Sequence, residues 1–312
     1  MNARRRRVAA QLLDRPGNLT LIDAVRHLVA VQAQDPAAFP LALRARVPGL
    51  TAAALDEARH DRELVRCWGP RGTLHLIARD DLAWLYPLVK PSPANPLRRL
   101  RQLGVDAPDP TTAARALAGQ GPLTKAELGE RVGAQGQAIV HLAMLAAAAG
   151  LVVLGPERRG KPTYVHAGDW LGAPLPTEPG DAALGRLVER YRAAHEPAEP
   201  DDFAAWSGLP VSRVKPLWRE SRSDGRAAEP VVRLIPAFDE YLLGWRDRDH
   251  AVAPEHRKIV HPGGGIIKPA VLVDGRVAGT WTRTGDGIDV QPFEPLPDLT
   301  AEIEDLCAFR GR

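Results

Sequence analysis

The sequence has few of the residues that build metal, redox and membrane sites. Its two cysteines, Cys67 and Cys307, lie far apart and form no C-x-x-C pair, so a reduced cytoplasm and no metal site are the simplest expectation. No apolar run reaches the ~18 residues that a membrane span needs. The apolar patch after Arg4–Arg7 is short and lacks a cleavage-site pattern, which argues against a secretory signal. We expect a cytoplasmic protein with no membrane partner.

The common catalytic signatures are missing as well. The chain has no Walker loop, no G-x-S-x-G and no H-E-x-x-H motif, and its cysteines and histidines lack metal-site spacing. The glycine run at 263–265 suits a phosphate, but it opens no evident helix after a strand, so a nucleotide loop is not expected. No cofactor is predicted.

The sequence does contain enough apolar residues for a core, and its charge is uneven. Hydrophobic residues make up 45% of 312 positions, an ordinary share, and the length allows two to four modules.

Charge is distributed unevenly along the chain. Residues 1–104 hold 17 Lys and Arg against 9 Asp and Glu, whereas the remainder holds 24 against 29. The N-terminal third is therefore the candidate surface for a polyanion, although many solvated helices are basic. Arg4–Arg7 either contact this polyanion or form a disordered basic end.

Helical spacing, capping residues and strand alternation predict three modules of similar plan. In the first, helices capped by Thr20 and Thr51 precede a hairpin over 64–77, centred on Gly-Pro-Arg-Gly. In the second, three helices between 109 and 149 precede a hairpin over 151–166. The third has a helix over 182–194 and then a helix–turn–helix with Gly208 at its turn.

From about residue 231 onward, the sequence is rich in predicted strands. Strands are predicted near 231–236, 270–281 and 288–290, with a hairpin turn at Asp274-Gly275 and a closing helix over 298–309. The fold class is therefore α+β. Tandem winged-helix domains are expected at residues 1–104, 105–171 and 172–228, and a mostly β domain at residues 229–312.

Two glutamines separated by one residue follow the helix capped by Thr20. Positions i and i+2 of a helix point in nearly opposite directions, so Gln32 and Gln34 can act together only if the chain leaves the helix here. Pro36 favours this because it biases Asp35 away from the α region. We expect a helix end that turns two amides into a cleft. The alternative is an ordinary polar helix terminus.

Four stretches together resemble one protein family. They are Leu28–Pro36 with its Gln-x-Gln, Trp68–Leu76, Phe203–Leu209, and Leu234–Gly244 followed by Arg-Asp-Arg at 246–248. In this order, and over essentially the whole chain, they resemble the winged-helix DNA glycosylases of the AlkZ type, relatives of YcaQ. The YcaQ-like branch has an acidic residue at the second position of the motif, so Gln34 puts this chain with the AlkZ-like branch.

The resemblance implies a function and a catalytic pair. Tandem winged helices would support a C-terminal β domain around a concave DNA-binding cleft. The activity would be excision of N-alkylated purines from double-stranded DNA, including bulky adducts and, in some members, interstrand crosslinks; such members often protect producers of DNA-alkylating antibiotics. The family's catalytic pair falls on Gln32 and Gln34.

The chemistry can also be argued from the residues. A purine alkylated at N7 is cationic and leaves without protonation, so an enzyme needs mainly to place a water and stabilise an oxocarbenium-like sugar. The carbonyl oxygens of Gln32 and Gln34 can do both, whereas a neutral amide is a poor base. No lysine lies near the motif, which disfavours Schiff-base lyase chemistry. Asp35 either activates the water or caps local structure.

Both hairpins offer candidate contacts to DNA. On the first, the candidates are Arg71, Thr73 and His75, because an arginine-led wing can enter a minor groove. At the tip of the second, basic side chains suit phosphates; these are Arg158, Arg159 and Lys161. The alternatives are a solvated turn with ordinary strand pairing for the first hairpin and an exposed loop for the second.

Three further residues are expected to line the cleft. Asp239 and Arg246 belong to the fourth of the family-like stretches, and Lys268 follows the glycine run. A buried structural Arg–Asp pair is the alternative for this stretch.

The main rival function is a winged-helix DNA-binding protein without catalysis, such as a transcription regulator. The Ala-rich helix over 137–149 presents only Gln137 and His141 as base readers, which is poor for the major groove. Three different winged helices also offer no dimer symmetry, so a monomer is expected. A relative that kept the fold and lost activity is a third reading.

Overall fold

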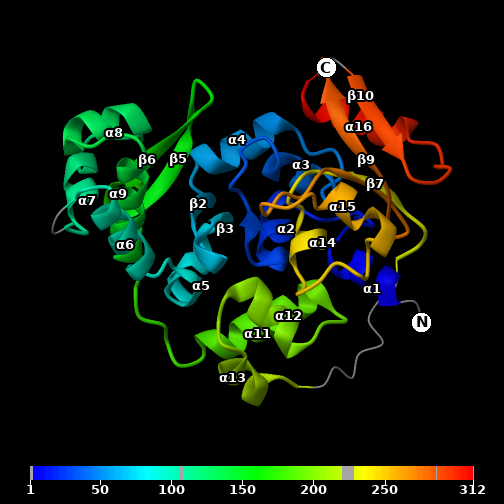
Figure 1. Cartoon of the computed structure of the whole chain (residues 1–312), viewed down its shortest axis with the longest axis horizontal. Coiled ribbons are helices and arrows are strands. Elements are labelled where there is room, and N and C mark those ends of the chain that lie inside the picture. The colour runs from blue at the N-terminus through cyan, green and yellow to red at the C-terminus, as the bar shows by residue number, and fades with distance from the viewer. Residues whose placement is uncertain (1–2, 106–107, 220–227, 286, 312) are drawn as a thin grey trace. The chain divides into compact units, whose positions relative to one another are not determined.

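The structure is a computed structural model that describes residues 3–105, 108–219, 228–285 and 287–311 (Figure 1). It is a mixed α/β chain that groups into two compact units. The first unit comprises residues 1–55 and 185–312, and the second comprises residues 56–184. Among the described residues, no helix is both long and apolar enough to cross a membrane.

The second unit is built on antiparallel strands in the order β3-β2-β5-β6-β4. These strands are β2 (Leu64–Trp68), β3 (Leu74–Ala78), β4 (Leu123–Thr124), β5 (Val152–Arg158) and β6 (Lys161–His166). Its helices are α5 (Leu82–Val89), α6 (Ala94–Gln102), α7 (Thr112–Leu117), α8 (Lys125–Val132), α9 (Gln137–Ala148) and α10 (Ala167–Leu171). Short 3₁₀ turns, η1 (Pro70–Gly72) and η2 (Arg79–Asp81), flank β3, and α4 (Ala52–His60) leads into the unit.

Local sequence explains how α8 and α9 pack together. Thr124 and Glu127 form a reciprocal capping box at the start of α8, and Gly133 ends it in the left-handed conformation. A Cβ on Gly129 would lie 2.6 Å from Cδ1 of Ile139. Glycine at this position therefore lets α9 approach α8, and the Ala-rich α9 fills the core of the unit.

The first unit carries the C-terminal sheet, which is antiparallel in the order β10-β9-β8-β7. Its strands are β7 (Val232–Ile235), β8 (Ala270–Val273), β9 (Arg276–Thr284) and β10 (Gly287–Pro292). Its helices are α1 (Ala3–Ala10), α2 (Leu21–Leu28), α3 (Phe39–Arg44), α11 (Ala183–His195), α12 (Pro200–Ser207), α13 (Val211–Val214), α14 (Glu240–Leu243), α15 (Arg257–Val260) and α16 (Thr300–Phe309). Two 3₁₀ turns, η3 (Lys215–Leu217) and η4 (Pro254–His256), and the two-residue strand β1 (Val31–Gln32) complete it.

Helix α1 is part of the body of this unit rather than a disordered end. Val8 is buried in the core around the C-terminal sheet. Arg4 donates to the carbonyl of His250 at 2.9 Å, and Arg7 donates to the carbonyl of Pro197 at 3.1 Å. At least two of the four N-terminal arginines therefore hold the fold together.

Most elements predicted from the sequence are present. Both hairpins, the caps at Thr20 and Thr51, the helix–turn–helix around Gly208 and the turn at Asp274-Gly275 are confirmed. Helix α6 was not predicted; Pro91 and Pro93, which precede it, are residues that commonly end a helix. Part of the third predicted module, residues 220–227, lies outside the described residues. The bounds of the four predicted domains stay predictions.

Candidate functional site

The helix before the two glutamines ends earlier than Pro36 predicts. Helix α2 stops at Leu28, and Val29 takes φ +72° and ψ −56°. The N–H of Ala30 donates to the carbonyl of Leu28 at 2.9 Å, which closes a γ-turn around Val29. A positive φ is sterically unfavourable for a β-branched residue, and Val29 is fully buried. Packing at Val29, and not the proline, takes the chain out of the helix.

Beyond this turn the burial of successive residues alternates. Val31 and Ala33 are buried, Gln32 is half-buried and Gln34 is exposed. Alternation of this kind is typical of an extended chain, in which residues i and i+2 point to the same side. Strand β1 itself covers only Val31 and Gln32, and Gln34 lies in the bend that follows. From the alternation in burial we infer that both amides face the same side, as their joint action requires.

Asp35 serves the turn that follows. Its Oδ1 accepts a hydrogen bond from the N–H of Ala37 at 2.8 Å, and its carbonyl accepts from the N–H groups of Ala38 and Phe39. This is the local capping that an aspartate commonly provides in a turn. The structure supports the capping reading of Asp35 over that of a catalytic base.

A carboxylate from a distant part of the sequence holds the backbone of this segment. Oε1 of Glu240 accepts a hydrogen bond from the N–H of Gln32 at 2.6 Å. Glu240 is only 2% exposed and is the first residue of α14. The sequence analysis missed its role, because nothing in the local pattern ties residue 240 to residue 32.

Asp239 is a structural residue, which corrects its predicted place in a DNA-binding cleft. Its side chain is completely buried and receives two hydrogen bonds from Arg46, both at 2.8 Å. Oδ1 also caps α14 by accepting from the N–H of Tyr241 at 2.9 Å. The alternative of a buried Arg–Asp pair is therefore correct, with Arg46 as the partner and not Arg246.

The other two residues predicted to line the cleft keep their side chains accessible. Arg246 is exposed, and its backbone N–H donates to Oδ1 of Asp202 at 3.1 Å. Lys268 is half-buried, and its backbone N–H donates to the carbonyl of Val260 at 3.0 Å. Their predicted contacts with DNA stay predictions.

The three candidates for DNA contact on the first hairpin differ in their exposure to solvent. Arg71 is exposed in the turn η1 with φ +57°. Thr73 is half-buried and donates its hydroxyl to the carbonyl of Pro70 at 3.2 Å, which stabilises the turn. His75 is completely buried opposite Cys67 in the ladder. The structure therefore argues against the predicted DNA contact of His75 and supports ordinary strand pairing.

His75 is one of three histidines with a strongly lowered pKa; His75 and His195 are completely buried, and His250 is half-buried. Burial lowers the pKa of each to about 3. Each ring donates one N–H to a backbone carbonyl: Thr73 for His75, Tyr191 for His195 and Tyr241 for His250. We call His75, His195 and His250 the low-pKa histidines.

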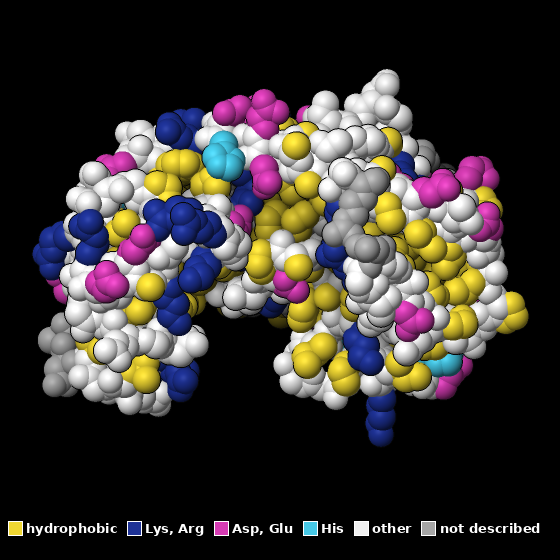
Figure 2. All heavy atoms as spheres, turned by 90° about the horizontal axis from the view of Figure 1, so that it is seen from above, with side chains coloured by type: hydrophobic (Ala, Val, Ile, Leu, Met, Phe, Trp, Pro, Cys, Tyr) yellow, Lys and Arg dark blue, Asp and Glu magenta, His cyan; other side chains and the backbone are white. Residues whose placement is uncertain are grey.

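The second hairpin presents all three of its basic candidates at the surface. Arg158, Arg159 and Lys161 are exposed, and Lys and Arg side chains gather on the left of Figure 2, where this unit lies. Arg158 pairs with Glu127 of α8. Hydrogen bonds from Arg158 and Thr124 hold the pKa of Glu127 at about 2, so the pair is charged at neutral pH. The carboxylate of Glu127 therefore competes with a phosphate for the Arg158 guanidinium.

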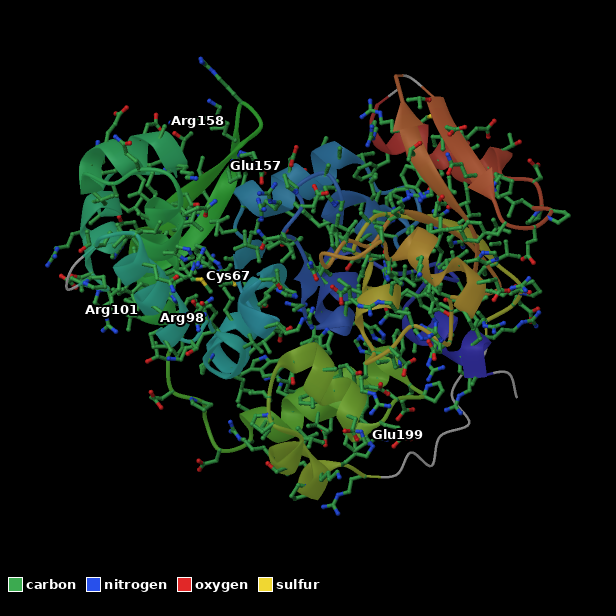
Figure 3. The ribbon with its side chains drawn as sticks, viewed as in Figure 1. Cys67, Arg98, Arg101, Glu157, Arg158 and Glu199 are labelled. Atoms are coloured by element: carbon green, nitrogen blue, oxygen red, sulfur yellow. The ribbon has the colours of Figure 1, made fainter. Side chains whose placement is uncertain are left out.

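Helix α6 is a basic surface that the sequence analysis missed. Arg98, Arg99 and Arg101 are exposed on it, the first and last of them labelled in Figure 3. Residues 82–105 contain no Asp or Glu. Arg98 and Arg99 donate to the neutral side chains of Asn95 and Gln102, and no described carboxylate pairs with any of the three. The acid-free stretch was the signal that would have found these α6 arginines.

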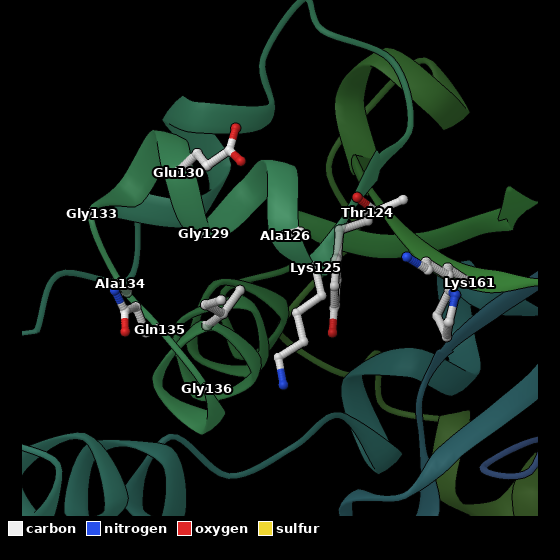
Figure 4. A pocket seen from close by; sticks show the side chains of 13 residues that line it. Thr124, Lys125, Ala126, Gly129, Glu130, Gly133, Ala134, Gln135, Gly136 and Lys161 are labelled. Atoms are coloured by element: carbon white, nitrogen blue, oxygen red, sulfur yellow. The ribbon is translucent and has the colours of Figure 1, made fainter. Parts of the chain in front are cut away.

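A pocket of about 820 Å³ lies within the second unit, away from the glutamine segment in sequence (Figure 4). It is bounded by α8, the turn after α8 and strand β6. Lys125 and Lys161 line it together with Tyr164. In the described parts of the chain, no group of three or more His, Cys, Asp or Glu could hold a metal ion. Burial raises the pKa of the Cys67 thiol to about 12, which makes it a poor nucleophile.

Comparisons with known proteins agree over nearly the whole chain. A profile of the protein family described as "DNA glycosylase AlkZ-like" matches residues 25–309. The interstrand DNA cross-link repair glycosylase of Streptomyces sahachiroi is 28% identical over an alignment of 356 residues, which covers 96% of this chain and 92% of that protein. The solved structure of the Streptomyces sahachiroi DNA glycosylase AlkZ has a TM-score of 0.77 at 25% identity and covers 98% of this chain and 94% of that one.

Proposed function

The chain belongs to the AlkZ-like DNA glycosylase family, and from that premise we propose that it hydrolyses the N-glycosidic bond of N-alkylated purines in double-stranded DNA. It acts as a monomer and has no lyase activity. The observation that supports this best is the glutamine segment itself. A strained turn at Val29 ends α2, and the alternating burial beyond it supports a shared orientation of Gln32 and Gln34.

The two amides suit a substrate that is already a good leaving group. Alkylation at N7 or N3 places a positive charge on the purine, so its departure needs no general acid. The carbonyl oxygens of Gln32 and Gln34 accept hydrogen bonds from a water and orient it toward the sugar carbon, where positive charge develops. The first lysine of the chain is Lys90, so the motif has no neighbouring amine for a Schiff base.

We extend the proposed substrates to bulky adducts and interstrand crosslinks. The relative from Streptomyces sahachiroi is named as an interstrand cross-link repair glycosylase. A crosslinked base cannot leave the duplex freely, so this substrate requires an open cleft in place of a closed base pocket.

Residues 112–166 of the second unit have the element order of a winged helix, and we propose that this part binds DNA as one. Helices α7, α8 and α9 precede the hairpin β5-β6, and β4 between α7 and α8 pairs with β6. Its hairpin tip would contact phosphates through Arg158, Arg159 and Lys161. Further winged helices at residues 1–104 and 172–228, around a concave cleft, complete the proposed architecture.

We add the α6 arginines to this proposed DNA surface. Their charges have no described carboxylate to neutralise them, so phosphates are the partners that fit. Arg71 on the first hairpin, together with Arg246 and Lys268 of the first unit, is a proposed DNA contact as well.

The proposal is tested by incubating the purified protein with DNA that carries N7-methylguanine, a bulky N7 adduct or an N7–N7 interstrand crosslink. Alkali then converts abasic sites into strand breaks. We expect breaks above a no-enzyme control on at least one substrate, and none on undamaged DNA. Binding to DNA without breaks on any of the three substrates would instead support a non-catalytic winged-helix protein.

A further inference from the structure

We infer that Glu240 is a positioning residue for the excision reaction: its carboxylate holds the peptide N–H of Gln32 and thereby keeps both glutamine side chains on one side of the chain. This inference rests on the proposed function of Gln32 and Gln34. It concerns a contact to the backbone, so Glu240 needs no contact with the substrate.

The hydrogen bond from Gln32 to Glu240 has the features of a strong anchor. It is short, at 2.6 Å, and its acceptor is a carboxylate only 2% exposed. Hydrogen bonds to ionised acceptors are roughly twice as strong as bonds between neutral groups. A buried carboxylate also needs such donors, because water cannot replace them. Breaking this hydrogen bond is therefore unfavourable for both partners.

Helix α14, which begins at Glu240, is held in place at both of its ends. At the start of the helix, Asp239 caps it and is fixed by the two hydrogen bonds from Arg46. At the end, the N–H of Gly244 donates to the carbonyl of Glu240 at 2.8 Å, and a Cβ on Gly244 would lie 2.3 Å from His195. Close packing of Gly244 against His195, together with the cap from Asp239, positions α14 and the carboxylate that it carries.

The glutamine segment needs an anchor because its own backbone is strained. Val29 holds a positive φ that α2 could avoid by continuing as a helix. A longer helix would turn Gln32 and Gln34 to opposite sides. The bond from Gln32 to Glu240 opposes that change, since the N–H would otherwise be drawn into the helix. Glu240 therefore acts on the geometry of catalysis, and DNA affinity does not depend on it.

The test compares Glu240→Ala with Glu240→Gln. The glutamine keeps a carbonyl oxygen that accepts from Gln32, whereas alanine has none. Glu302→Ala is a harsher control: Glu302 is also a buried carboxylate of the first unit that accepts from the N–H of Leu234 at 3.0 Å, and in addition it pairs with three arginines. Single-turnover excision of N7-methylguanine, the Kd for the same DNA and the hydrogen exchange of the Gln32 amide are measured for each folded variant.

We expect Glu240→Ala to lower the single-turnover rate by roughly 10- to 100-fold, the scale of a 1 Å misplacement. Its Kd should stay within about twofold, and the Gln32 amide should exchange faster. Glu240→Gln should recover most of the rate, and Glu302→Ala should leave the rate of the folded protein unchanged.

Three outcomes would overturn the inference: Glu240→Ala keeps the wild-type rate, Glu240→Gln loses as much rate as Glu240→Ala, or Glu302→Ala loses as much rate as Glu240→Ala. If the wild-type protein excises none of the three lesions, the proposed function fails, and the exchange of the Gln32 amide still decides whether Glu240 anchors the segment.

Discussion

Removing the carboxylate of Asp239 should destabilise the first unit severely. The guanidinium of Arg46 is completely buried and donates two hydrogen bonds to Asp239, both at 2.8 Å. It also donates to the carbonyls of Gln11 and Ala42 at 2.9 and 2.8 Å. Asp239→Ala removes the only carboxylate among these acceptors and leaves a buried cation that neutral oxygens must solvate alone.

The expected loss follows from two contributions. Breaking a buried ion pair from one side costs about 3–5 kcal/mol, and loss of the cap on α14 adds about 1 kcal/mol. The sum approaches the whole stability of many domains, which is about 5–15 kcal/mol. Asp239→Asn keeps the cap and one acceptor, so it should lose clearly less.

Urea unfolding at pH 7, followed by circular dichroism, measures this loss. Asp247→Ala is the control, because Asp247 is an exposed aspartate of the same unit. A loss below about 1 kcal/mol for Asp239→Ala would refute the reasoning about a buried charge. Weaker DNA binding at unchanged stability would restore the rejected role of Asp239 in DNA contact.

Three further predictions concern DNA affinity and pH. Replacing the α6 arginines together by alanine should weaken DNA binding and reduce the slope of log Kd against log salt by about 0.9 for each phosphate that the protein no longer neutralises. The control is Arg115→Ala, which removes a cation already paired with Asp109 and should leave the slope unchanged. An equal slope in both variants would contradict the assignment. Glu127→Gln keeps a capping side chain but removes the charge that pairs with Arg158. DNA affinity at low salt, measured by fluorescence anisotropy, should then rise roughly two- to fivefold. Unchanged or weaker binding would show that Arg158 makes no contact with DNA. The low-pKa histidines bind protons more weakly in the folded state than in the unfolded state. Their contribution to the free energy of unfolding should therefore be full above pH 6.5 and fall as pH drops towards 3, by up to ~1.4 kcal/mol per pH unit for each histidine. A thermal midpoint at pH 5 equal to that at pH 7 would contradict the burial argument.

The sequence predicted the elements whose signals are local. Thr20 caps α2 by accepting from the N–H of Asp23, three residues later, and Asp274-Gly275 turns β8 into β9 across two. Alternating apolar residues likewise located both hairpins. Such features depend on neighbours along the chain, so they can be identified without knowledge of packing. The opposite case is α6, whose prolines looked like helix terminators although helices tolerate proline in their first turn.

Features set by distant partners could not be predicted. Asp239 was expected at a surface because its motif mixes polar and apolar residues, but its partner Arg46 lies 193 positions away. His75 has the alternation of a strand, and only the assembled sheet buries it. Val29 is the clearest case: a β-branched residue at positive φ contradicts local preference, so tertiary packing must impose it. The exit from α2 was predicted correctly, but for the wrong reason.

The claim that Gln32 and Gln34 carry the reaction is tested most directly by Gln34→Ala. The measurement is single-turnover excision of N7-methylguanine from a duplex, with the Kd for that duplex measured in parallel. Gln291→Ala, which removes an exposed glutamine from β10, is the control. The proposal predicts a fall of roughly 100-fold or more in the rate of Gln34→Ala, a Kd within about twofold of wild type, and no effect in the control. Excision by Gln34→Ala at the wild-type rate, or a loss of rate fully matched by a loss of affinity, would contradict it.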